Sequence, residues 1–208
     1  MVVAGKARAI RYFTNSRNGF MKIFNEEFSV LKSSLKLNKI DFSNYRPRIA
    51  VTIIYSLLQT TLVSIIGLVV SLLKSKKDFN FVFYPVSFGC ILIYSYGAGY
   101  FYKACFDKRD SYTFFMHVYI CMYSISYLPV FCILQSIHKV LSWIFFLAFW
   151  ILSEYALCLN YRDMILGSDD PQRTNFLLNI SALVTQGIFL AAYSILLRYF
   201  FTCFLVRF

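Results

Sequence analysis

The sequence predicts an all-α membrane protein, a polytopic bundle of about five transmembrane helices, and three observations predict it. Of the 208 residues, 59% are hydrophobic and only 15% are charged, whereas soluble domains carry roughly 25% charged residues. The apolar residues gather in blocks of about 20 residues or more, the length of a helix that crosses roughly 30 Å of hydrocarbon. Strands of membrane barrels run only about ten residues and alternate in polarity, so helices are expected instead.

The chain divides into a leader and a membrane domain. Residues 1–48 form a basic, partly amphipathic N-terminal segment, and residues 49–208 hold the five predicted spans. These spans cover residues 49–73, 79–102, 111–137, 140–161 and 174–198. Because the joints between them are short, consecutive helices are expected to be antiparallel neighbours.

The leader allows three interpretations. Its apolar residues recur at near-helical spacing from Ile10 to Leu31, with basic residues between them, which is typical of a helix lying flat in the membrane interface. No acidic residue precedes Glu26, a property shared with mitochondrial targeting peptides. The third interpretation is a plain cytosolic flank whose charge only sets the orientation of the chain.

The distribution of Lys and Arg predicts a cytosolic N-terminus and a C-terminus on the other side. In this orientation 15 of the 21 basic residues lie on the inner side and six on the outer side. Ten of the 15 belong to the leader, so the prediction depends on that segment. The net charge of +11 is explained by orientation and by attraction to anionic lipid. We find no nucleic-acid-binding module and expect no nucleic acid as a partner.

The sequence assigns no catalytic, cofactor-binding or metal-binding residue, so neither an enzyme nor a cofactor is expected. Nucleotide-binding fingerprints and hydrolase motifs do not occur in it. His117 and His138 lie about six helical turns apart in one predicted span, too far apart to share a metal. The six cysteines form no C-x-x-C pair and are interpreted as small buried hydrophobes. Asp169 and Asp170 are interpreted as part of a turn before the last span.

Two features of the spans have physical consequences. Glu154 is the only acid within a predicted span and lies eight residues before Arg162. Ionisable groups inside a membrane are functional candidates by default, and for Glu154 a structural, an interfacial and a proton- or substrate-binding role all stay open. In the second span, Ser95 and Gly99 form a small-xxx-small pair, which lets helix backbones approach closely. Gly99 is therefore predicted to lie at the tightest contact of that helix.

Three segments carry a resemblance to a known family. The second span contains YSYGAGY at residues 94–100, the third contains YSISYLP at residues 123–129, and the joint before the last span is DDPQR at residues 169–173. Over roughly residues 85–200 the chain resembles the Yip family, five-span membrane proteins of the Golgi and endoplasmic reticulum named for interaction with Ypt/Rab GTPases. It carries Ser126-Tyr127 where members commonly have Gly-Tyr before the proline of the third span.

The resemblance implies a non-catalytic scaffold in vesicle traffic between the endoplasmic reticulum and the Golgi. Its implied partners are the lipid bilayer, Rab-type GTPases and other membrane proteins, with the chain as part of a hetero-oligomer. One alternative is a structural accessory subunit of a mitochondrial inner-membrane, respiratory-chain complex, which the acid-free basic start favours. A small transporter is a third alternative and depends on Glu154 alone.

Overall fold

The computed structural model describes residues 39–40, 49–73, 81–107, 112–136, 139–166 and 168–200. Within these residues every regular element is an α-helix. The helices are α2 (Ile49–Leu73), α3 (Phe83–Phe106), α4 (Phe114–Ser124), α5 (Leu128–Gln135), α6 (Lys139–Leu166) and α7 (Pro171–Phe200). The predictions for the leader fall on residues 1–48, of which only Lys39 and Ile40 are described.

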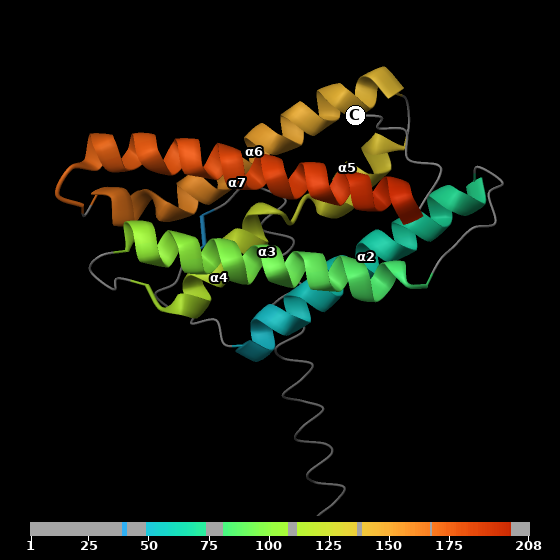
Figure 1. Cartoon of the computed structure of the whole chain (residues 1–208), viewed down its shortest axis with the longest axis horizontal. Helices are drawn as coiled ribbons and strands as arrows, with labels where there is room; N and C mark the ends of the chain where they lie inside the picture. Colours follow the sequence, from blue (N-terminus) through green and yellow to red (C-terminus); the bar gives the residue numbers. More distant parts are fainter. Residues whose placement is uncertain are drawn as a thin grey trace, which may run out of the picture.

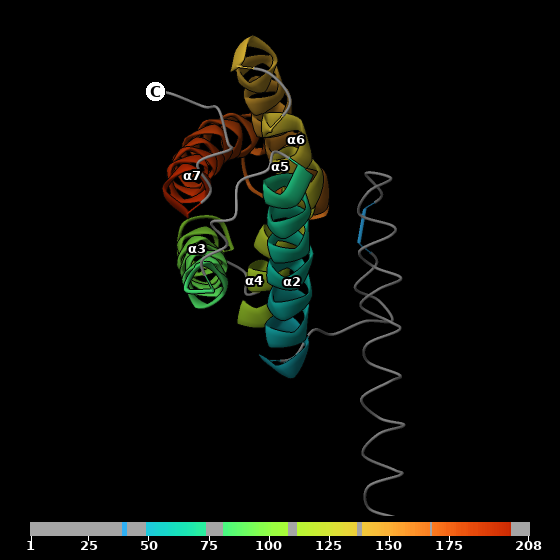
Figure 2. The same ribbon diagram turned by 90° about the vertical axis from the view of Figure 1, so that its right-hand side faces the viewer.

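The helices run back and forth along one long axis and form a bundle (Figure 1). Seen along this axis, α3 and α7 make up one side, and α2, α4, α5 and α6 make up the other (Figure 2). The consecutive pairs α2–α3, α3–α4, α5–α6 and α6–α7 pack against each other, as the short joints predict, and the pairs α3–α7, α2–α4, α2–α5 and α4–α6 close the bundle. The two described residues that precede α2 in the chain, Lys39 and Ile40, are tied to α6: the Ile40 amide donates to Asn160 Oδ1 at 2.8 Å and Lys39 pairs with Asp163.

Within the described residues, four segments are long and apolar enough to cross a bilayer, which identifies the chain as a multi-pass membrane protein. They are α2, Phe114–Gln135 (α4 and α5 together), Leu141–Leu166 of α6 and α7. The predicted count of five is not reproduced, because α3 is not among them. This helix is 24 residues long, but its five tyrosines and its glycines and serines lower its hydropathy.

The polarity of α2 is the reverse of that of a helix in a soluble protein. Its bundle-facing side buries the polar residues Thr52, Ser56, Gln59, Thr60, Ser64 and Ser71. Its outer side exposes the large apolar residues Ile53, Leu57, Ile65, Leu68 and Leu72. Water would make such an outer surface unfavourable, whereas hydrocarbon accepts it at no cost. The arrangement therefore agrees with a lipid environment around the bundle.

The third predicted span, residues 111–137, is not one continuous helix. Its two halves, α4 and α5, are separated by three residues in a turn, 125–127. Pro129 explains the break, since proline has no N–H and its ring clashes with the carbonyl four residues earlier, that of Ile125. This carbonyl instead accepts the Leu128 amide at 3.0 Å, three residues away.

The helix ends differ from the predicted spans where polar residues continue a helix beyond the membrane. α6 runs five residues past the predicted end at 161, to Leu166, and includes Arg162 and Asp163. α7 begins at Pro171 rather than at 174, with the Asp170 carboxylate accepting the Arg173 amide at 3.1 Å. An aspartate that caps a helix whose first residue is proline is a common start, and it confirms the predicted turn.

Candidate functional site

The tyrosine-rich helix α3 is joined to both of its neighbours by hydrogen bonds between hydroxyl groups. Towards α2, Tyr96 pairs with Thr52 and Tyr84 with Thr61, each at 3.1 Å. Towards α7, Tyr102 pairs with Thr185 at 2.6 Å and Ser87 with Tyr193 at 2.5 Å. A hydroxyl group that enters hydrocarbon without a partner is costly, and hydrogen bonds of this kind hold membrane helices together. These four pairs explain how a helix of low hydropathy lies within the bundle.

The break between α4 and α5 is lined by amide side chains from two other helices. Gln59 of α2 donates to the Met122 carbonyl at 3.3 Å. Gln186 of α7 donates to Ser124 Oγ at 2.7 Å. Both glutamines are fully buried, and each satisfies an acceptor in the last turn of α4. Irregular backbone in a membrane protein is tolerated where the protein buries it and supplies such partners.

The same region holds polar atoms that the protein leaves unsatisfied. Gln59 Oε1 and Gln186 Oε1 are buried and have no hydrogen-bond partner among the described residues, and the buried Tyr94 hydroxyl lies next to Ser124 and Gln186. We call the group formed by Gln59, Tyr94, Ser124 and Gln186 the polar centre. Its groups are neutral hydrogen-bonding groups, suited to water or to an uncharged polar group rather than to an ion.

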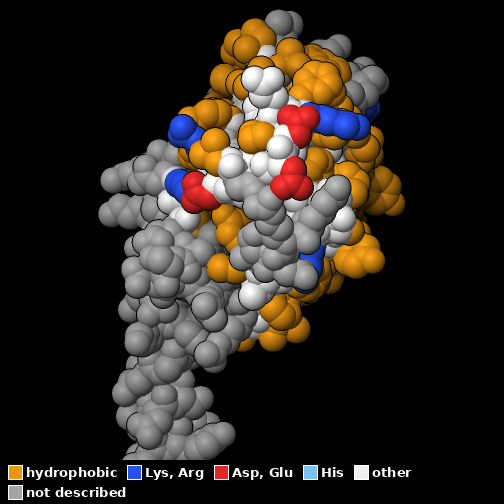
Figure 3. Space-filling model, turned by 90° about the vertical axis from the view of Figure 1, so that its left-hand side faces the viewer, with side chains coloured by type: hydrophobic (Ala, Val, Ile, Leu, Met, Phe, Trp, Pro, Cys, Tyr) orange, Lys and Arg blue, Asp and Glu red, His pale blue; other side chains and the backbone are white. Residues whose placement is uncertain are grey.

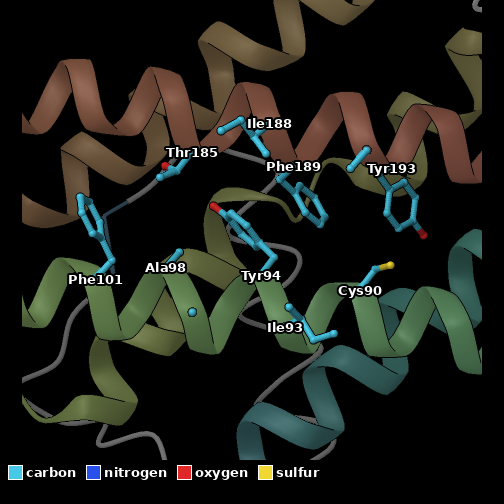
Figure 4. A pocket seen from close by; sticks show the side chains of 11 residues that line it. Cys90, Ile93, Tyr94, Ala98, Phe101, Thr185, Ile188, Phe189 and Tyr193 are labelled. Atoms are coloured by element: carbon cyan, nitrogen blue, oxygen red, sulfur yellow. The ribbon is translucent and has the colours of Figure 1, made fainter.

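A groove of about 400 Å³ runs between α3 and α7 beside the polar centre (Figure 4). The rings of Tyr94 and Phe189 approach from opposite helices, with their centroids 4.2 Å apart. Gly97 forms part of the wall, and a Cβ there would have no atom within 4 Å. The remaining lining residues are Cys90, Ile93, Ala98, Phe101, Thr185, Ile188, Ala192 and Tyr193. Ile93 and Ile188 are 77% and 67% exposed, so the groove opens towards the lipid.

A buried histidine ties together three elements at one end of the bundle. His117 of α4 lies between Asp107, whose Oδ2 is 3.0 Å from Nε2, and Tyr161 of α6, whose hydroxyl is 2.9 Å from Nδ1. The same Asp107 oxygen accepts the Tyr112 amide at 2.8 Å. A carboxylate and a hydroxyl on one imidazole can form part of a general-base site. Here His117 and Tyr161 have no exposed surface. Their hydrogen bonds link Asp107, at the end of α3, to α4 and α6.

Asp107 is a residue of this cluster that the sequence alone does not mark as functional. This residue follows the second predicted span and was counted with a polar joint, where carboxylates are normally solvated. Burial of its carboxylate depends on His117, ten residues later. The one feature of the sequence that could indicate a buried partner is His117 itself, because a histidine inside an otherwise uncharged span needs a polar group beside it.

Glu154 lies apart from these sites, in the seam between α6 and α7. Its Oε1 is 3.5 Å from the Cys158 thiol, and this thiol is 3.0 Å from Asn179 Oδ1 of α7. The other described charges gather mainly at the end of the bundle where α6 gives way to α7. Figure 3 views this end and shows acidic and basic side chains among polar atoms, with hydrophobic side chains around them.

The described cysteines, Cys90, Cys105, Cys121, Cys132 and Cys158, are free thiols. Among the described residues, no three His, Cys, Asp or Glu side chains are grouped so that they could hold a metal ion. The candidate sites are therefore the neutral polar centre and the membrane-facing groove next to it. Comparison of the chain with protein-family models, with curated proteins and with solved structures finds no match.

Proposed function

We propose that this chain is a five-span, non-catalytic membrane scaffold that binds other membrane proteins in vesicle traffic between the endoplasmic reticulum and the Golgi. The groove between α3 and α7 is the observation that carries the binding role. The resemblance to the Yip family supplies the compartment, the sibling membrane proteins and the Rab-type GTPases as partners. The sites in the described residues are suited to binding, and the proposal assigns no reaction to them.

The groove suits a helix of another membrane protein. Its walls are almost entirely apolar and it opens towards lipid, where helices associate by close van der Waals packing rather than by leaving water. Gly97 leaves open space in the wall, so a partner's side chain or backbone can approach α3 there.

The proposal includes α3 as the fifth span. A helix of 24 residues is about 36 Å long, enough to cross roughly 30 Å of hydrocarbon. It packs against α2, α4 and α7, and four of its hydroxyl groups are paired with hydroxyl groups of α2 and α7. These contacts support a membrane-crossing position for α3 despite its tyrosines.

Photo-crosslinking tests the binding role of the groove. A photoreactive amino acid at Ile188 lies in the groove, and the same amino acid at Ile195 lies on an exposed part of α7 outside it. In native membranes we expect position 188 to give adducts with another membrane protein, and position 195 to give lipid adducts. Lipid adducts alone at both positions would contradict a scaffold that uses this groove.

Imaging of a tagged chain tests the compartment. Vesicle traffic between the endoplasmic reticulum and the Golgi predicts a reticular pattern with Golgi puncta. The alternative, an accessory subunit of a respiratory-chain complex, predicts a mitochondrial pattern, which the basic and initially acid-free leader favours. Mitochondrial staining would overturn the trafficking role and leave the groove to be tested as a subunit contact.

A further inference from the structure

Glu154 lies within the apolar part of α6 and not among the charged residues at the end of that helix. On α6 it precedes Arg162 by eight residues, which corresponds to about 12 Å along a helix. Its neighbour across the seam, Asn179, follows Arg173 by six residues on α7. The charged residues of both helices lie closer to the bundle end, and about two helical turns separate the carboxyl group from them.

The chain does not neutralise this acid within its described part. The one hydrogen-bonding contact of the Glu154 side chain is with the Cys158 thiol. That thiol has a single proton and lies closer to Asn179 Oδ1. The described residues include no Lys, Arg or His within ion-pair distance of Glu154. A carboxylate held at this depth costs several kcal/mol unless a cation or a proton neutralises it.

The surface around Glu154 faces outward and is apolar. Glu154 itself is only partly buried. The next exposed positions of α6 are Ile151 and Tyr155, which are 60% and 52% exposed. Across the seam, α7 exposes Ile180 and Val184, at 45% and 53%. A single acid thus lies on a broad hydrophobic face, and none of these residues belongs to the α3–α7 groove.

We propose that this seam binds a transmembrane helix of a partner protein that carries a Lys or Arg at the depth of Glu154. A cation from the partner would neutralise the carboxylate in a medium of low dielectric constant, where an ion pair is much stronger than in water. The exposed apolar side chains on both sides would pack against the same helix. The inference concerns a different surface from the groove and does not depend on the trafficking role.

A second copy of this chain cannot supply the Lys or Arg that would neutralise Glu154. Lys and Arg are missing from residues 49–73, 79–102, 111–137, 140–161 and 174–197. A copy of the chain therefore has no cation to offer at this depth in any of its predicted spans. The partner is instead a different membrane protein, one whose span contains a basic residue about two turns from its end.

Energy transfer in lipid vesicles tests this inference with the full chain. The chain carries a donor label, and a synthetic Leu/Ala transmembrane peptide with one Lys two turns from its end carries the acceptor. Two matched peptides have Leu or Asn in place of the Lys. For the native chain we expect the Lys peptide to associate at least tenfold more strongly than either matched peptide. In Glu154→Gln we expect the three peptides to associate equally.

Ile151→Gln is the matched control, since it places the same amide on the same face one turn away and keeps the acid. We expect this variant to retain the preference for the Lys peptide, with both variants melting like the native chain in detergent. Equal association of the Lys and Leu peptides with the native chain would overturn the inference. A preference that persists in Glu154→Gln, or an Asn peptide that binds as strongly as the Lys peptide, would overturn it too.

Discussion

Val118 of α4 lies so close to Gly99 of α3 that no side chain fits at position 99. A Cβ on Gly99 would be 2.9 Å from both Cγ2 and the backbone nitrogen of Val118, and 3.0 Å from its Cα. Two of these atoms belong to the backbone, so a rotation of the valine side chain cannot relieve the contact. On the same helix Gly89 and Gly97 have open space where a Cβ would be. The sequence-based prediction that Gly99 faces a closely packed neighbouring helix is therefore confirmed, and of the three glycines of α3 it makes the tightest contact.

The first prediction concerns this contact. Gly99→Ala should lower the free energy of unfolding by about 1–3 kcal/mol, because α3 and α4 must move apart, and Gly99→Leu should lower it further.

Two variants of neighbouring positions are the controls. Gly97→Ala should be neutral or stabilising by up to about 1 kcal/mol, since alanine favours the helix. Ala98→Leu should cost less than Gly99→Leu, as Ala98 borders the groove. Thermal unfolding of the purified variants in one detergent measures the order, and equal melting curves would contradict it.

The second prediction concerns topology. If α3 crosses the membrane, the joint before it and the joint between α6 and α7 lie on opposite sides. A cysteine in place of Lys76 should react with an impermeant thiol reagent from the non-cytosolic side, and a cysteine in place of Asp169 from the cytosolic side. Labelling of both positions from one side would mean that α3 does not span, leaving the four spans of high hydropathy.

The third prediction concerns the polar centre. Gln186 and Ser124 share a buried hydrogen bond of 2.7 Å, for which we expect a coupling free energy of about 0.5–1.5 kcal/mol. The double-mutant cycle uses Ser124→Ala, Gln186→Met and the combined variant in chemical unfolding. Ser64→Ala is the control, since Ser64 Oγ is buried without a partner in the described residues. Paired with Gln186→Met it should show no coupling, and additive effects for Ser124 and Gln186 would argue against the contact.

The fourth prediction concerns His117, which bridges Asp107 and Tyr161. His117→Leu removes two buried hydrogen bonds, one of them to a carboxylate, and should lower the free energy of unfolding by about 2–4 kcal/mol. Tyr161→Phe removes only one of them and should cost about 1 kcal/mol. Unfolding of both variants in detergent checks the ratio. If Tyr161→Phe were as damaging as His117→Leu, the carboxylate would not be the stronger partner.

The sequence predicts the helical class and the positions of the helices because both follow from local composition. The boundaries of α2 agree with the first apolar block, since charged residues flank it on both sides. Pro129 carried the signal for the broken helix, but a proline can also be accommodated in a continuous kinked span. Which of the two occurs depends on whether other helices supply hydrogen-bond partners near the break, as Gln59 does for the Met122 carbonyl and Gln186 for the Ser124 hydroxyl.

The sites depend on tertiary contacts that a single sequence does not contain. The groove needs α3 and α7, which are separated by three other helices in the chain. Burial of Asp107 likewise requires that α4 folds back so that His117 reaches it. Gly99 was predictable because its small-xxx-small spacing lies within one helix, whereas its neighbour Val118 was not.

The hydroxyl pairs of α3 set an order for the biogenesis of the chain. Tyr84 and Tyr96 find their partners on α2, which the ribosome has already made when α3 emerges. Tyr102 and Ser87 find theirs on α7, which is made after all the other described helices. Until α7 is inserted, α3 is hydrogen-bonded only to α2, and two of these four hydroxyl groups have no partner on another helix. α7 therefore completes the hydrogen bonding of α3. A chain truncated before Pro171 would expose an incompletely paired α3 to the quality-control proteases of its membrane.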